Sequence, residues 1–230
     1  MYSAAALDAP WPDVSSERLA ALAATAEDWA FCAPGLSRDE LLCAAFLILR
    51  PYAEAADVPL DALRTLLLVL EGNYCARNAY HNFTHAVDVL QCAHVVLRAA
   101  GGGDLPPGAV TWSLGDIVRG PHARLAVLLA AIAHDVGHPG LTNAFLVAHE
   151  APVALLYNDC AVLESMHAAT FFAMARHPRC NIGARWSRDT WRAFRATALA
   201  AILGTDMAQH FRHVSALESL FGRMASGSAP

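Results

Sequence analysis

The sequence predicts an all-α fold, and three observations support this prediction. Helix-start and helix-stop residues recur along the chain: Ser37 and Glu40 form a capping-box pattern, and Pro59 precedes an apolar run. Gly101 to Gly103 follow another apolar run. The sequence contains no segments of alternating β-branched residues bounded by turns, so no sheet is required. Hydrophobic residues make up 56% of the chain and charged residues 16%, which favours a deeply buried helical core over disorder.

These signals, together with apolar spacing, predict helices over residues 37–50, 59–72, 80–100, 121–136, 142–149, 152–158, 162–176 and 187–209. The capping box opens the first of them. Proline lies at or near the start of the second, fourth and sixth, where its missing N–H is not needed. Glycine ends the second and the third, and apolar spacing predicts the others. Because the 230 residues show no compositional break, we expect one domain over 15–222, between a linker, 1–14, and a tail, 223–230.

Composition and charge exclude several classes of protein. All 16 basic residues are arginine, so the chain has no lysine for a P-loop, a Schiff base or a general base. With a net charge of -5 and no arginine-rich patch, no nucleic-acid partner is expected. The longest central apolar run, Leu125 to Ala133, is far too short for a membrane span. Asp8 and Asp13 precede the first basic residue, which is unlike a secretory signal, so we expect a cytoplasmic location. Dimerisation or membrane tethering through regions outside this chain stays open.

Two stretches carry candidate chemistry. In YHNFTHAVDV, residues 80–89, His81, His85 and Asp88 have the spacing of a stripe along one face of a helix. In LAVLLAAIAHDVGHPGLTN, residues 125–143, nine apolar residues end in His134 and Asp135. A helix that is apolar on all sides is buried, so this pair should enter the interior of the domain. A buried carboxylate must be paired there or coordinate a metal.

Together, the histidines of both stretches and Asp135 form the donor set that zinc and similar divalent ions prefer. A carboxylate that bridges two ions is the usual device for phosphoester hydrolysis. The alternatives are a solvated polar face for the two histidines of the first stretch and a structural role for a capped Asp135. His167, three residues after Glu164, is equally consistent with a core histidine and with a site residue.

Four stretches in this order, YHNFTHAVDV, HDVGHPGLTN, YNDCAVLESMH and LGTDM, resemble the catalytic domain of class I cyclic-nucleotide phosphodiesterases, a branch of the HD-domain phosphohydrolases. The resemblance covers residues 80–207. It implies a multi-helix bundle with a buried binuclear metal site, which hydrolyses a 3′,5′-cyclic nucleotide, cAMP or cGMP, to the 5′-monophosphate. The implied ions are zinc at the first position and magnesium or manganese at the second.

The resemblance also implies a role for each matching residue. His85, His134 and Asp135 would bind the tighter metal, and Asp135 would bridge to the second. His81 corresponds to the general acid that protonates the departing 3′ oxygen, and histidine suits this role because it titrates near neutral pH. The other matching residues reach the second metal through water or form the wall of the site, and they are Tyr80, His138, Asn143, Glu164 and Thr205.

The resemblance stops short of the whole family pattern. Family members carry a fourth metal-ligand aspartate and a base-binding glutamine downstream of the TDM motif, whereas the 23 residues from Ala208 to Pro230 contain no aspartate. We therefore expect the chain to represent part of a catalytic domain, with impaired activity. The alternative functions are a broader HD-type phosphohydrolase and a non-catalytic helical regulatory module.

Overall fold

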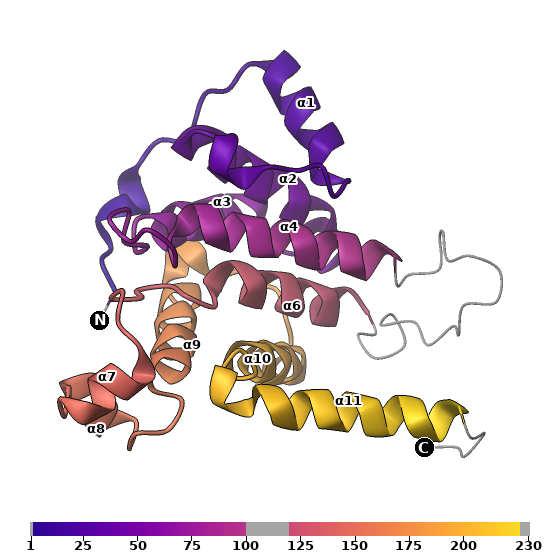
Figure 1. Ribbon diagram of the computed structural model, residues 1–230. Helices are drawn as coiled ribbons and strands as arrows, with labels where there is room; N and C mark the ends of the chain where they lie inside the picture. The colour runs from indigo at the N-terminus through magenta and orange to yellow at the C-terminus, as the bar shows by residue number, and fades with distance from the viewer. Residues whose placement is uncertain (1, 100–119, 226–230) are drawn as a thin grey trace.

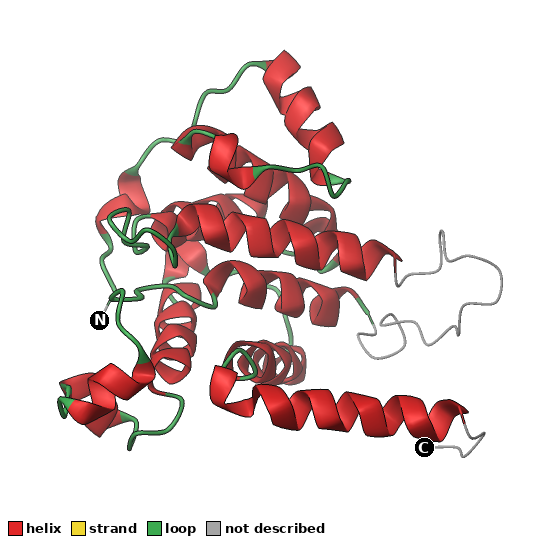
Figure 2. Cartoon of the chain, in the orientation of Figure 1, coloured by secondary structure: helices red, strands yellow, loops and turns green. Residues whose placement is uncertain are grey.

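The computed structural model describes residues 2–99 and 120–225, and in these residues the prediction of an all-α fold is confirmed. Figure 2 shows helices joined by loops, and the described residues contain no strand. The helices, in chain order, are α1 (Ser16–Ala26), α2 (Arg38–Ala55), α3 (Leu60–Glu71), α4 (Phe83–Ala99), α6 (Pro121–Ala133), α7 (Asn143–Ala148), α8 (Pro152–Leu156), α9 (Val162–Ala175), α10 (Arg188–Leu203) and α11 (His210–Ala225). Short 3₁₀ helices include η1 (Ala5–Asp8), η2 (Ala33–Gly35), η3 (Pro178–Cys180) and η4 (Met207–Gln209).

Helices α4 and α6 form the centre of the bundle and run side by side (Figure 1). Helix α2 contacts both of them, α3 packs on α2, and α10 packs on α6. Helix α6 is buried around its circumference, as its apolar run predicts, through Leu125, Ala126, Leu128, Leu129, Ala130, Ile132 and Ala133. A second, smaller core joins α7, α8 and the start of α9, and it consists of Leu146, Ala154, Val162 and Leu163. The central pair therefore fixes the C-terminal end of α6, and the smaller core fixes the first turn of α9.

Four predicted helix boundaries differ from the structure by three residues or more. Helix α2 continues past residue 50 to Ala55, with Pro51 inside it, and α6 ends at Ala133 instead of at residue 136. The other two boundaries each have a clear local cause. The helix expected over 80–100 begins at Phe83, because the Asn82 side chain accepts a hydrogen bond from the backbone N–H of His85 at 3.1 Å and so caps the helix. The helix expected over 187–209 ends at Leu203, where Gly204 follows. Asp206 then starts the separate turn η4 by accepting a hydrogen bond from Ala208 N–H at 2.9 Å. Helices α1 and α11 were not expected from the sequence.

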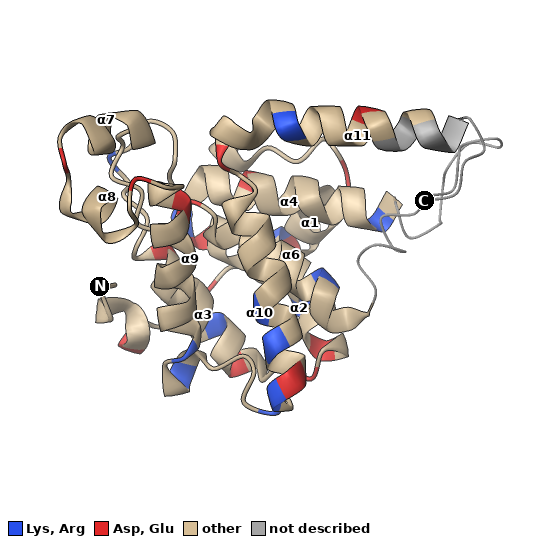
Figure 3. Cartoon of the chain, turned by 90° about the horizontal axis from the view of Figure 1, so that it is seen from below, with Lys and Arg blue, Asp and Glu red and all other residues tan. Residues whose placement is uncertain are grey.

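The segment expected to be a linker, 1–14, packs against the bundle in its described part. Asn73 exchanges two hydrogen bonds with the backbone of Ser3, and the Trp11 ring lies edge-on to Phe46 of α2 at 5.3 Å between centroids. Figure 3 marks the acidic and basic residues along the ribbon, where they are sparse and interspersed among the helices. Among the described helices, none combines the length and the apolar character that a bilayer crossing requires.

Candidate active site

The start of α4 places His81 and His85 differently from the predicted helical stripe. His85 lies in the first turn of α4, whereas His81 lies in the turn before the helix, with φ +27°. The prediction that His81, His85 and Asp88 share one face of a helix is therefore wrong. The cause is the Asn82 cap, which begins the helix after His81. Both histidines nevertheless line the same cavity.

The end of α6 brings His134 and Asp135 into the interior, as the sequence predicts. The Nδ1–H group of His134 donates to the carbonyl oxygen of Ala131 at 2.8 Å, so Nε2 can present the lone pair that a metal ligand needs. This Nε2 atom lies 3.0 Å from Oδ2 of Asp135, and Nε2 of His85 lies 3.5 Å from the same oxygen. The ligand atoms of these three residues all lie within 4.8 Å of one another and can hold one metal ion.

The surroundings of Asp135 fit a cation at this position. Asp135 is 8% exposed, and among the described residues its buried Oδ2 atom has no hydrogen bond of acceptable geometry, although Nε2 of His134 and Nε2 of His85 lie close to it. An unsatisfied buried carboxylate oxygen is costly, and a bound cation removes that cost. Although burial opposes ionisation, the neighbouring His134 holds the pKa of Asp135 at about 2, so the group is ionised at neutral pH.

The pKa values of the two histidines are consistent with this donor set. Burial, and the nearby His134, lower the pKa of His85, so its imidazole is neutral as a ligand must be. Burial also acts to lower the pKa of His134, but the Asp135 carboxylate raises it above its ordinary value. A metal ion bound to Nε2 would displace the proton that this carboxylate favours. Two imidazoles and a carboxylate form a set that suits zinc.

A second group in the cavity consists of His81 and His138, whose rings stack at 3.9 Å between centroids. One nitrogen of each ring and an oxygen of Asp135 also lie within 4.8 Å of one another. The backbone N–H of Gly140 donates to Nδ1 of His138 at 3.0 Å, so a neutral His138 carries its proton on Nε2 and is a donor there. Asn78 fixes the backbone of both histidines, because its Nδ2 donates hydrogen bonds to the carbonyl oxygens of His138 and His81 at 3.0 and 3.3 Å.

The remaining predicted residues lie at the wall of the site. Glu164, in the first turn of α9, and Thr205, after α10, line the cavity, which has a volume of about 220 Å³. Asn143 lies behind Glu164 and donates to its Oε2 from Nδ2 at 2.9 Å. Tyr80 is 59% exposed, and its ring lies 4.2 Å from that of His85. The structure therefore brings seven predicted residues around one cavity, namely His81, His85, His134, Asp135, His138, Glu164 and Thr205, with Asn143 and Tyr80 against its lining.

His167 also belongs to the cavity, which the sequence left undecided. It is 1% exposed, its Nδ1–H donates to the carbonyl oxygen of Val136 at 2.8 Å, and its Nε2 lies 3.8 Å from Oδ1 of Asp135. Burial lowers its pKa to about 4, so a neutral imidazole offers an acceptor to the cavity. The signal in the sequence is the three-residue spacing from Glu164, which places both on neighbouring positions of one helix. Leu163 and Met207 also line the cavity, and as apolar residues they gave no chemical signal.

Comparison with known protein families agrees with this geometry. The family model described as 3'5'-cyclic nucleotide phosphodiesterase matches residues 80–227, more than half of the chain. The chain belongs to the 3'5'-cyclic nucleotide phosphodiesterase family. The match includes both stretches of candidate chemistry and the helices that carry them, from the turn before α4 into α11.

Two curated phosphodiesterases show the extent of the similarity. The human high affinity cAMP-specific and IBMX-insensitive 3',5'-cyclic phosphodiesterase 8A is 38% identical over 156 residues, which cover 67% of this chain and 17% of that protein. The dual specificity calcium/calmodulin-dependent 3',5'-cyclic nucleotide phosphodiesterase 1 of Drosophila melanogaster is 40% identical over 159 residues, which cover 69% of this chain and 18% of that protein. The chain thus spans less than a fifth of the length of these two relatives.

A solved phosphodiesterase shares the fold over most of this chain. The phosphodiesterase domain of the Salpingoeca rosetta rhodopsin phosphodiesterase is 30% identical and matches with a TM-score of 0.75. The match covers 90% of this chain and 58% of that one. A second crystal structure, of the phosphodiesterase domain of the RhoPDE fusion protein from the same choanoflagellate, is 29% identical and has the same TM-score. The helical arrangement described above is therefore that of a phosphodiesterase domain.

Proposed function

We propose that this phosphodiesterase-family chain takes part in the metal-dependent hydrolysis of a 3′,5′-cyclic nucleotide, cAMP or cGMP, to the 5′-monophosphate. The observation that carries the proposal is the arrangement at Asp135. Within the described residues, this buried, ionised carboxylate has an oxygen without a hydrogen bond, and it faces metal-type donors from α4 and from the turn after α6. His81, the candidate general acid, lines the same cavity. A carboxylate shared between ions and a nearby imidazole are the groups that phosphodiester hydrolysis requires.

In this proposal His85, His134 and Asp135 hold zinc, and Asp135 also serves a second ion, magnesium or manganese. Glu164 and Thr205 line the cavity and would reach the second ion through water. When bound, the two ions would polarise the phosphate group and stabilise the charge that develops on it. The donor set of the first group, two imidazoles and a carboxylate, favours zinc over magnesium.

The histidines divide the proton chemistry between them. His81 would donate its proton to the departing 3′ oxygen, which is the task of a general acid. Burial and the nearby His81 lower the pKa of His138, so His138 stays neutral at neutral pH. Its Nε2–H is then a hydrogen-bond donor to an oxygen of the phosphate or of water, because Nδ1 accepts from Gly140.

The remaining parts of the proposal concern the wider protein. We propose that residues 15–222 contribute to one catalytic domain and that this domain acts in the cytoplasm. Dimerisation or tethering to a membrane would involve regions outside this chain. The cyclic nucleotide is its small-molecule partner.

The proposal is tested by measuring hydrolysis of cAMP and cGMP under saturating zinc and magnesium for the wild type, His81→Ala, Asp135→Asn and His149→Ala. His149 is exposed, and its Nδ1–H donates to Phe145 O, so its variant is a matched control. We expect Asp135→Asn to lose zinc and turnover together. His81→Ala should keep its zinc and lose about 10² to 10⁴ in turnover, the usual contribution of a general acid.

A nitrophenyl phosphodiester separates the possible outcomes, because its leaving group needs little protonation. His81→Ala should harm the cleavage of this ester less than the cleavage of a cyclic nucleotide. Equal losses on both substrates would contradict the acid role. Cleavage of the ester without any cyclic-nucleotide hydrolysis would indicate a broader phosphohydrolase, and nucleotide binding without turnover would indicate a regulatory module.

A further inference from the structure

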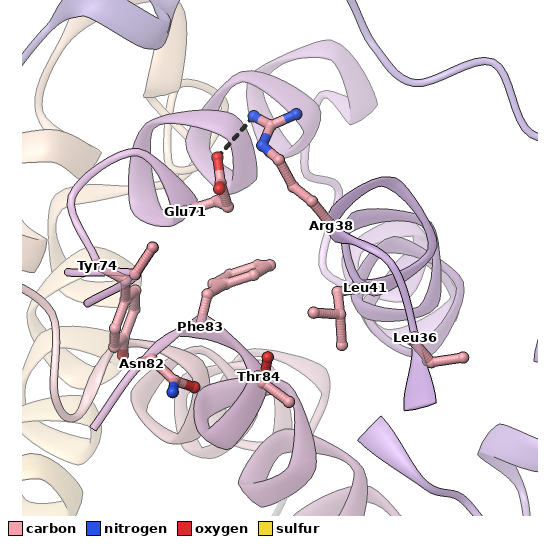
Figure 4. Close-up of a pocket in the computed structure, with 9 residues that line it drawn as sticks. Leu36, Arg38, Leu41, Glu71, Tyr74, Asn82, Phe83 and Thr84 are labelled. Carbon is pink, nitrogen blue, oxygen red and sulfur yellow. Dashed lines mark hydrogen bonds and ion pairs between the residues drawn. The ribbon is translucent and has the colours of Figure 1, made fainter. Parts of the chain in front are cut away.

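A tyrosine outside the active-site cavity contacts both elements that carry the metal-type donors. Tyr74 lies between α3 and α4, is 7% exposed and belongs to the main core. Figure 4 shows it beside Phe83 and Asn82 at a pocket of about 260 Å³, which residues of α2, α3 and α4 also line. The active-site cavity has a different set of lining residues and does not include Tyr74.

The hydroxyl group of Tyr74 satisfies the backbone at the end of α6. Its Oη donates to the carbonyl oxygen of Ile132 at 2.8 Å and accepts from the backbone N–H of Asp135 at 3.4 Å. In a continuing α-helix the N–H of Val136 would donate to Ile132, but here it donates to Ala133 at 3.1 Å. A carbonyl oxygen can only accept a hydrogen bond, so the Tyr74 hydroxyl group is the donor to Ile132. It therefore takes over the lost helical bond at the turn that carries His134 and Asp135.

The ring of Tyr74 reaches the second element. It lies 5.8 Å from the ring of Phe83, at 55° between planes, and Phe83 is the first residue of α4. His85 lies two residues further along that helix. The neighbouring residue Asn73 contacts the turn after α6, because its carbonyl oxygen accepts a hydrogen bond from the N–H of Gly137 at 3.1 Å. One short segment thus holds the end of α6 and the start of α4.

We propose that Tyr74 is a positioning residue of the metal site, which sets the distance between the His134–Asp135 turn and His85 through its hydroxyl group and its ring. This inference rests on the proposed function, because it assumes that the three donors bind zinc. The three donors come from α4 and from the turn after α6, so zinc affinity depends on how firmly these two elements are held relative to each other. Groups that orient ligands from behind in this way typically contribute 10- to 100-fold to metal affinity.

The test is the dissociation constant for zinc, measured by competition with a chromogenic chelator at neutral pH. The variants are Tyr74→Phe, which removes one oxygen atom, and Tyr52→Phe as a matched control. Tyr52 is a partly buried tyrosine of α2 whose hydroxyl group is 3.0 Å from Nδ1 of His94, outside the active-site cavity. Both variants should lower the melting temperature of the metal-free protein. Only Tyr74→Phe should weaken zinc binding, by about 10- to 100-fold.

A merely structural role predicts the same zinc affinity for both variants, and that result would overturn the positioning role while leaving the proposed function intact. Absence of zinc binding in the wild type would overturn the metal site itself, and the positioning role with it. If Tyr74→Phe does not fold, Phe83→Leu replaces it, since this variant keeps the hydroxyl group and loses the ring contact. Weaker zinc binding in Phe83→Leu is expected, and unchanged affinity would contradict the proposal.

Discussion

Substitution of Asn82 by alanine tests whether this side chain places His81, in addition to stabilising the bundle. The Asn82 side chain makes two hydrogen bonds: Oδ1 accepts from His85 N–H at 3.1 Å, and Nδ2 donates to the carbonyl oxygen of Asn78 at 2.9 Å. The first caps α4, and the second holds the turn in which His81 lies. Asn82→Ala should therefore disturb both the helix start and the candidate acid.

The expected loss of stability follows from these two bonds. Loss of an N-cap side chain costs about 1 kcal/mol, and loss of a further partly buried hydrogen bond costs about 1 kcal/mol more. The sum of about 2 kcal/mol corresponds to a fall in melting temperature of roughly 4–8 °C for a chain of this size. Asn82→Ser keeps an oxygen that can cap the helix, so it should recover about half of the loss.

Thermal unfolding and cyclic-nucleotide turnover should be measured in parallel, with Ser37→Ala as the control. Ser37 caps α2 by accepting from Glu40 N–H at 3.3 Å, so its loss also costs about 1 kcal/mol, but α2 carries no residue of the active-site cavity. We expect turnover to fall in Asn82→Ala and to be unchanged in Ser37→Ala at a temperature where both are folded. If the two variants retain the same turnover, the cap does not place His81, and our account of this turn is wrong.

Two further substitutions test the ligands and the turn that supports them. His85→Ala should abolish tight zinc binding, because it removes one of three donors. Metal analysis after dialysis measures this, with His149→Ala as the control. Unchanged zinc content would exclude His85 as a ligand. Gly140→Ala should lower turnover. Gly140 has φ +79°, and a Cβ atom there would lie 3.0 Å from Oδ1 of Asn78. Asn78 in turn donates hydrogen bonds to the carbonyl oxygens of His81 and His138. Gly120→Ala carries a similar backbone strain at φ +82°, and its added Cβ atom would meet no heavy atom of residues 2–99 and 120–225 within 4 Å. Equal turnover in the two glycine variants would therefore refute the contact with Asn78 as the cause.

The sequence was most informative where one physical effect acts alone. The apolar run 125–133 predicted a helix buried around its circumference, and the structure confirms this because each side of α6 meets another element. The same run predicted that His134 and Asp135 would be brought into the interior, where they now lie. Those inferences needed only helix geometry and the cost of burying a charge.

Prediction failed where two local signals competed. The i, i+4 spacing of His81 and His85 suggested one helix, but the asparagine between them is a strong cap and determines where α4 begins. Asp206 acted in the same way after Gly204 and separated η4 from α10. Both capping residues are present in the sequence, and at each of these positions the cap outweighs the apolar spacing.

Other features depend on distant residues, and the local sequence did not decide them. The spacing from Glu164 left the role of His167 open, whereas the fold places His167 in the cavity and the carbonyl oxygen of Val136, 31 residues away, fixes its tautomer. The role of Tyr74 depends on backbone groups 58 and 61 residues away. The sequence identifies such residues only by their type. The fold shows which polar atoms they contact.

The uneven packing of the bundle has a consequence for its local unfolding. Helix α11 lies at the outside of the molecule, its main contacts in the described part of the chain are with η4, and Phe211 and Leu217 are 81% and 53% exposed (Figure 1). A helix of 16 residues with so little support is only marginally stable in water. Its amide hydrogens should exchange with solvent through fraying of the helix alone, long before those of α6, whose exchange requires the central bundle to open. The loss of protection should therefore begin at α11 and end at α6, the helix that His134 follows.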